Sequence, residues 1–127
     1  MTVLPERRFC YMKSKDVLIL KKILEYCSQV TEACEMFGNE YNKFVKCSVF
    51  QNACCMCILQ IGELCKVISE DLRLQEKQIP WKAWCGIRDI FAHQYSNLDY
   101  QSAWDTIQSD LPELRSEVER LLKQLES

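Results

Sequence analysis

Apolar side chains repeat along the chain at intervals of three and four residues, the spacing that gathers them on one face of an α-helix. The first such stripe begins just after Asp16, a residue type suited to an N-cap, and ends near Phe37 and Gly38. Its members are Val17, Leu20, Leu24, Cys27, Val30 and Cys34. We therefore predict a first long helix that opens at Asp16.

A second stripe runs from Glu40 to about Leu74. Its members are Phe44, Cys47, Phe50, Cys54, Cys57, Ile61, Leu64 and Ile68. The length of this stripe predicts a short helix that runs into a long one.

The polar segment 75–80 ends in Pro80, which predicts a loop followed by a helix, because the missing N–H of proline costs nothing at the start of a helix. That next helix, over residues 81–93, is rich in aromatic side chains. Trp81, Trp84 and Phe91 belong to it, and we expect Trp81, Trp84 and Trp104 to pack in the core.

Asp99 can cap a final helix, which Pro112 would interrupt or bend. The apolar positions of this helix are Trp104, Ile107, Leu111, Leu114, Val118, Leu121 and Leu122. With three glycines, three prolines and no long alternation of apolar and polar residues, the sequence predicts an all-α fold. We expect an antiparallel bundle of four to five helices, forming one domain over residues 1–127, with residues 1–15 as an N-terminal extension.

Composition places the chain among soluble globular proteins, with 48% apolar and 27% charged residues. No apolar run approaches the roughly 18 residues typical of a membrane span. The first residues include Glu6, Arg7 and Arg8 and lack the apolar centre of a signal peptide. We therefore expect a cytoplasmic protein without a membrane partner.

The chain contains nine cysteines, a high number for its length, and an odd number excludes complete pairing in internal disulfides. Cys54 and Cys57 have the C-x-x-C spacing of zinc sites, yet no second ligand pair is present and the single histidine lies far along the chain. Because several cysteines share the apolar stripes, we interpret them as reduced, small core residues. We expect neither a metal nor a cofactor.

The net charge of −2 is unusual for a protein that binds nucleic acid mainly through the phosphates of the nucleic acid. Its distribution is uneven. Residues 1–25 carry six Lys or Arg against three acids, whereas residues 99–127 carry three against seven. Solvated helix faces account for most of these charges.

The only histidine, His93, stands in the pattern R-D-x-x-x-H-x-Y, formed with Arg88, Asp89 and Tyr95. Alone, an arginine five residues before a histidine is a weak signal. Here it lies between Ile79-Pro80-Trp81 and the Trp104 to Pro112 segment, and over about residues 15–125 the chain resembles the HepT family of HEPN-domain toxins. Gln94 departs from the glycine that is common in that family.

The resemblance implies an HEPN-like fold and metal-independent cleavage of RNA, with tRNA or mRNA as the expected substrate. In that family the partner is a minimal nucleotidyltransferase antitoxin that attaches AMP to the motif tyrosine, which Tyr95 matches. The resemblance therefore implies the toxin of a two-gene toxin-antitoxin system.

The residue types suit this chemistry. Histidine side chains in general titrate near neutrality, so His93 can take a proton from a ribose hydroxyl or give one to a leaving oxygen. Arg88 can hold the phosphate and stabilise the charge that builds up on it. Asp89, four residues before His93, could orient the imidazole.

Positions five apart on a regular helix point about 140° away from each other, so Arg88 and His93 do not share a face. Either the helix ends or distorts before His93, or the side chains converge with those of a second subunit. Because acid–base cleavage benefits from two proton-transfer groups and the chain has one histidine, we expect a homodimer.

Two other functions compete with the enzyme. One is a noncatalytic RNA- or nucleotide-binding partner of a nucleotidyltransferase, which the sequence pI of about 5.5 would suit. The other is a purely structural bundle, which leaves the motif unexplained. The presence of Arg88, His93 and Tyr95 together favours the ribonuclease.

Overall fold

The computed structural model describes residues 5–93 and 99–126, and the side chains of residues 14–87 and 99–126. This part of the chain is helical and contains no strand. Its longer helices are α1 (Pro5–Phe37), α3 (Ser48–Lys66), α5 (Trp81–His93) and α7 (Leu111–Glu126). The shorter ones are α2 (Tyr41–Lys46), α4 (Glu70–Gln75) and α6 (Tyr100–Asp105). The predicted all-α, HEPN-like class is confirmed.

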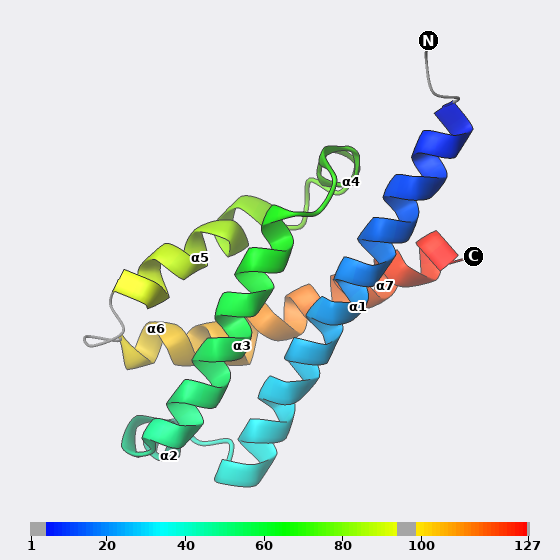
Figure 1. Ribbon diagram of the computed structural model, residues 1–127. Helices are drawn as coiled ribbons and strands as arrows, with labels where there is room; N and C mark the ends of the chain where they lie inside the picture. The colour runs from blue at the N-terminus through cyan, green and yellow to red at the C-terminus, as the bar shows by residue number, and fades with distance from the viewer. Residues whose placement is uncertain (1–4, 94–98, 127) are drawn as a thin grey trace.

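Helix α3 lies at the centre of the molecule, with α1 on one side and α5 on the other (Figure 1). Helix α6, the π-helical turn η2 (Thr106–Asp110) and α7 form one nearly continuous segment that crosses behind them. Helix α7 packs against α1. The first described turn of α1 and the end of α7 lie at the same end of the molecule.

The core forms along the predicted stripes. From α1, Leu20, Cys27 and Val30 are buried, and from α3, Phe50 and Ile61 are buried. Among the cysteines whose side chains the structure describes, most are small core residues, as predicted: Cys27, Cys34, Cys54, Cys55, Cys57 and Cys65 are buried free thiols, whereas Cys47 and Cys85 are half-buried.

The predicted start of the first helix at Asp16 is wrong. Helix α1 begins at Pro5 and runs through Asp16, whose side chain is 4% exposed. Its carboxylate accepts hydrogen bonds from the backbone N–H of Ser69 at 2.9 Å and from the Ser69 hydroxyl at 2.5 Å. Asp16 therefore ties α1 to the start of α4 instead of capping its own helix.

The predicted continuation of the central helix to about Leu74 is also wrong. Helix α3 ends at Lys66, and α4 begins after Ser69, whose hydroxyl accepts from the Leu72 N–H at 3.2 Å as an N-cap. Ile68, between the two helices, remains buried, which is why the apolar repeat continues across the break. The Arg73 guanidinium of α4 donates to the carbonyls of Cys65 and Lys66 at the end of α3 and so connects the two helices.

The last helical segment follows the prediction closely. The Asp99 carboxylate accepts from the Ser102 N–H at 3.2 Å and caps α6. Pro112 lies in the first turn of α7, directly after the π-helical turn. Proline cannot donate to a carbonyl one turn earlier, so a local widening of the helix at this point has a physical cause.

Helix α3 is long enough to cross a membrane and, with a mean hydropathy of 1.2, apolar enough to do so. This is contrary to the expectation from the sequence that no segment approaches this composition. The central helix of a bundle has the same composition, because it is covered on several sides. Here α3 packs between α1 and α5.

Candidate active site

Helix α5 carries the motif, and it forms over the residues predicted for it. Arg88, Asp89 and His93 belong to α5, of which His93 is the last residue. Their backbone is described, and their side chains lie outside the described residues, as do Gln94 and Tyr95 entirely. The described elements around α5 fix the position of this helix.

The start of α5 is fixed by the loop before it. The indole N–H of Trp81 donates to the Glu76 carbonyl at 3.1 Å, and the backbone N–H of Trp84 donates to the Pro80 carbonyl at 3.1 Å. Trp81 and Trp84 are both buried, as predicted for core residues. The beginning of the motif helix is thus anchored by two aromatic side chains.

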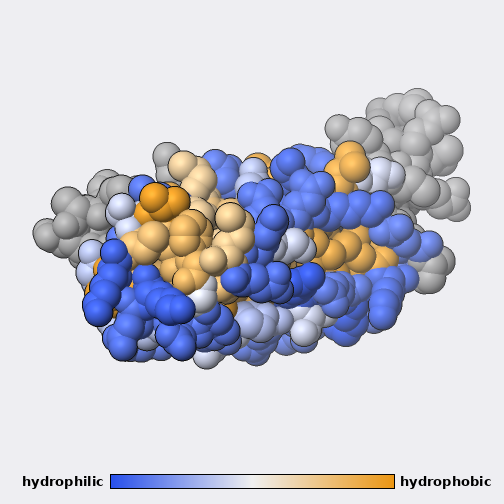
Figure 2. Space-filling view, turned by 90° about the horizontal axis from the view of Figure 1, so that it is seen from below, coloured by the Kyte–Doolittle hydropathy of each residue, from blue (hydrophilic) through white to orange (hydrophobic). Residues whose placement is uncertain are grey.

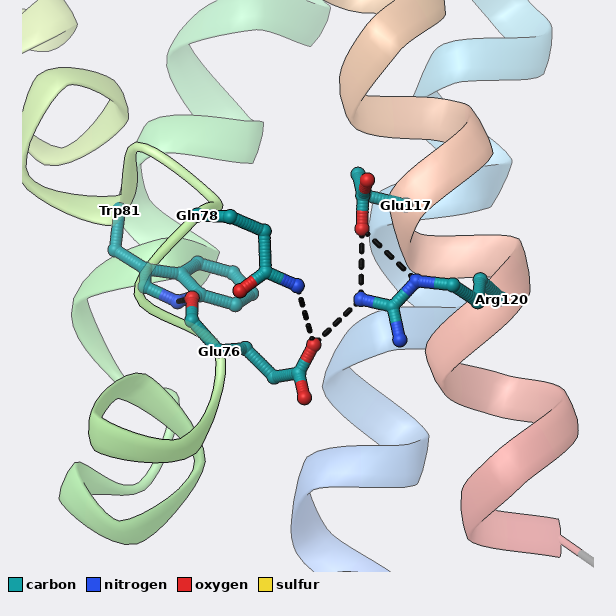
Figure 3. Close-up of polar contacts among 5 residues, drawn as sticks. All are labelled: Glu76, Gln78, Trp81, Glu117 and Arg120. Atoms are coloured by element: carbon teal, nitrogen blue, oxygen red, sulfur yellow. Dashed lines mark hydrogen bonds and ion pairs between the residues drawn. The ribbon is translucent and has the colours of Figure 1, made fainter.

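A polar network connects this loop to α7 (Figure 3). The Glu76 carboxylate accepts from Arg120 at 2.5 Å and from the Gln78 amide at 2.8 Å. The Arg120 guanidinium also donates to Glu117 at 2.7 and 3.0 Å. Since Glu76 also accepts the Trp81 indole through its carbonyl, one residue links α7 to the first turn of α5.

Close contact with α3 sets the position of α5 further along. A Cβ atom on Gly62 would lie 2.7 Å from the Trp84 carbonyl oxygen and 3.1 Å from the Ile87 side chain. Contacts of 2.7 Å are too short for a Cβ atom, so glycine is what allows the two helices to approach. The turn of α5 just before Arg88 is therefore held directly against the central helix.

Beside α5 lies a groove of about 380 Å³ between this helix and α7. The α5 side supplies apolar atoms, among them those of Ala83 and Ile87. The opposite side supplies the carboxylates of Asp110, the last residue of η2, and of Glu113 and Glu117 on α7. A wall of carboxylates repels phosphates, so this side of α5 is unfavourable for an approaching RNA.

The regular geometry of α5 excludes one alternative that the sequence left open, that the helix ends or distorts before His93. The helix is α-helical from Trp81 to His93, so it neither ends nor changes type before the histidine. Arg88 and His93 therefore occupy positions about 140° apart around its axis, whereas Asp89 and His93 lie one turn apart on the same side.

Other aromatic side chains gather where α2, α3 and α6 meet. Trp104, half-buried, packs against Phe44 at 5.3 Å and against Phe50 at 6.1 Å between ring centroids. Trp104 is thus part of the packing, as predicted. This cluster stabilises α6, the first helix after the segment that contains Tyr95.

Comparison with known families gives a match to the family model described as "Ribonuclease HepT-like" over residues 23–121. The match spans α3, α5 and the motif residues Arg88 and His93. The chain belongs to the HepT-like ribonuclease family.

Relatives of this HepT-like chain bear names of the same kind. Two come from Methanocaldococcus jannaschii: "Putative RNase MJ1216", 33% identical over 91% of this chain and 94% of the relative, and "Putative RNase MJ0125", 32% identical over 91% and 98%. A third, "Probable ribonuclease HepT" of Thermococcus cleftensis, is 30% identical over 81% and 96%. No solved structure matches the chain.

Membership in the HepT-like family confirms the resemblance seen in the sequence and supports a ribonuclease with RNA as its substrate. It argues against a purely structural bundle. Within the fold of this family, the structure adds the anchors that hold the motif helix: Trp81 with Glu76 at its first turn, and Gly62 beneath its middle.

Proposed function

We propose that this chain is a cytoplasmic, metal-independent endoribonuclease, the toxin of a two-gene system, which cleaves tRNA or mRNA with Arg88 and His93. The observation that carries the proposal is a family match that includes the R-D-x-x-x-H-x-Y segment, with Arg88, Asp89 and His93 on one regular helix. Cleavage of RNA by the purified chain in EDTA tests it.

Cleavage of RNA requires two proton transfers and stabilisation of the negative charge that builds up on the phosphate in the transition state. A histidine takes the proton of the ribose 2′-hydroxyl, the 2′-oxygen bonds to phosphorus, and the bond from phosphorus to the 5′-oxygen breaks as a second group protonates the leaving oxygen. Arg88 binds the phosphate and stabilises the additional negative charge in the transition state. Asp89, one turn before His93, supports the imidazole.

The site is composite in this proposal, formed where two copies meet about a twofold axis. The regular helix supports it, because Arg88 and His93 of one copy occupy different sides of α5. A twofold axis would bring the His93 of each copy into one groove, where the two histidines take opposite protonation states.

Mixed dimers test the composite site. Wild-type and His93→Ala chains with different affinity tags are combined, and the mixed species is isolated and assayed. A shared site predicts a rate well below half that of the wild-type dimer, since the groove lacks one of its two proton-transfer groups. Half of the wild-type rate, or a fully active monomer at high dilution, contradicts it.

Control by a nucleotidyltransferase completes the proposal. The Tyr95 phenol oxygen attacks the α-phosphorus of ATP, pyrophosphate leaves, and the phenolic proton passes to solvent or to a base of the transferase. The attached AMP adds a negative phosphate and bulk two residues from His93. RNA is then repelled and excluded from the site.

A further inference from the structure

Helix α1 presents one face that no other described element covers. The positions on this face are separated alternately by four and three residues: Leu18, Lys22, Glu25, Gln29, Glu32 and Met36. All are exposed, and the apolar residues at the two ends, Leu18 and Met36, are 70% and 74% exposed. This alternation keeps the same face turned toward a neighbouring helix over many turns.

Charge divides the same helix into two halves. Its basic residues all lie at or before residue 22, together with the acids Glu6 and Asp16: Arg7, Arg8, Lys13, Lys15, Lys21 and Lys22. Residues 23–37 carry three acids and no basic residue: Glu25, Glu32 and Glu35. Two such helices repel each other when parallel and attract each other when antiparallel.

We propose that this face joins two copies of the chain, with their α1 helices antiparallel about a twofold axis at the level of Cys27. In this register Leu18 of one copy faces Met36 of the other. Lys22 of one copy faces Glu32 of the other. Each contact occurs twice because the interface is symmetric.

A groove beside Met36 of one copy can receive Leu18 of the other copy. A groove of about 400 Å³ between α1 and α3 is lined by Ala33, Met36, Ala53 and Met56, among others. Met56 is 58% exposed, and an apolar patch covers this part of the surface, at the left of Figure 2. Methionine side chains adapt to an inserted group, and a leucine is of a size that such a groove can accept.

The centre of the face also fits a twofold arrangement. Near the axis, Glu25 of one copy lies opposite Gln29 of the other. The Gln29 side-chain oxygen accepts the Cys57 thiol at 3.6 Å, which leaves its amide N–H groups to donate. They can bind the Glu25 carboxylate of the second copy, which also pairs with Lys22 of its own chain at 3.1 Å.

This interface is separate from the proposed active site and does not rest on it. Helices α1 and α5 pack on different sides of α3 (Figure 1). A chain that uses only the α1 face forms a dimer, and a chain that uses both faces forms a larger assembly.

A charge swap provides a specific test, because Lys22 and Glu32 are ten residues apart, about 15 Å along the helix, and cannot pair within one chain. Lys22→Glu and Glu32→Lys are each expected to weaken association about tenfold, measured by sedimentation velocity across a dilution series. The double variant restores association, since the swapped charges again face each other. Lys77→Glu, in an exposed loop away from α1, is the matched control and leaves association unchanged.

A second variant tests the apolar contact. Leu18→Asp places a charge opposite the Met36 groove and is expected to halve the mass of the assembly while leaving the helical circular dichroism unchanged, because Leu18 is exposed in the single chain. A wild-type chain that is monomeric at micromolar concentration overturns the proposal. Unchanged mass in both single charge variants, or a double variant as weak as either single one, overturns it as well.

Discussion

Gly62 of α3 and Trp84 of α5 lie so close that a Cβ atom on Gly62 would come within 2.7 Å of the Trp84 carbonyl oxygen. Gly62→Ala must therefore push α5 away from α3. We expect a loss of about 1–3 kcal/mol in the free energy of unfolding, the usual cost of overpacking. Urea denaturation measures it.

Gly86, on α5, is the matched control. Nothing lies within 4 Å of the position that its Cβ would take, so Gly86→Ala adds helix propensity without a clash. It is expected to raise the free energy of unfolding by about 0.5–1 kcal/mol. Equal effects of the two substitutions would show that the close approach of α3 to α5 does not constrain the fold.

Asp16 and Ser69 provide the second prediction. Asp16→Ala removes the acceptor of the half-buried Ser69 N–H and hydroxyl and is expected to cost about 1–3 kcal/mol in the free energy of unfolding. Asp16→Asn keeps one acceptor oxygen and should cost less than half of that. If both variants unfold at the wild-type urea concentration, the contact does not hold α1 to α4.

Asp16 also shows where the sequence is insufficient. An aspartate just before an apolar stripe has the local pattern of an N-cap, yet the helix extends to Pro5 and the carboxylate binds a residue 53 positions away. Nothing in the neighbouring sequence encodes that partner. The same holds for the end of α3, where buried Ile68 continues the apolar repeat through a break set by Ser69.

The third prediction concerns the cysteines. Burial raises the pKa of the Cys27 and Cys65 thiols to about 12 and that of Cys55 to about 11. Because the thiolate is the reactive form, these three should resist iodoacetamide at pH 8 in the folded protein, while half-buried Cys47 and Cys85 react before them. Peptide mapping by mass spectrometry measures the order. Labelling of Cys65 as fast as Cys47 would contradict it.

The same shifts predict how stability depends on pH. An unfolded thiol loses its proton near its ordinary pKa of 9.0, whereas folded Cys27 and Cys65 keep theirs until about 12. Between these values the unfolded state binds fewer protons, so the free energy of unfolding falls as pH rises. Replacing Cys27 by alanine should make that fall less steep between pH 9 and 11.

The fourth prediction concerns the modification of Tyr95. Incubation with ATP, magnesium and the cognate nucleotidyltransferase should add one AMP to the chain and suppress RNA cleavage. The added phosphate would stand two residues from the only histidine. Intact-mass analysis detects the addition, and Tyr95→Phe should prevent both effects. A Tyr95→Phe chain that is still silenced would contradict this assignment.

Much of the candidate site could be predicted from the sequence because its elements are local. The Pro80 start and the aromatic stripe place Trp81 to His93 on one helix, and the structure confirms it. The anchors of that helix could not be predicted. Glu76 and Arg120 are 44 positions apart, and Gly62 faces α5 only once the helices pack.

Cleavage of a labelled RNA in EDTA under single-turnover conditions tests whether Arg88 and His93 carry out metal-independent catalysis. Wild type is compared with His93→Ala and Arg88→Ala, and with Lys77→Glu as a control outside the motif. We expect rates lowered about 10²–10⁴-fold for His93→Ala and about 10²–10³-fold for Arg88→Ala, with unchanged helicity and an active control. Strict dependence of the wild type on a divalent ion, or full activity in both alanine variants, would contradict the proposed mechanism.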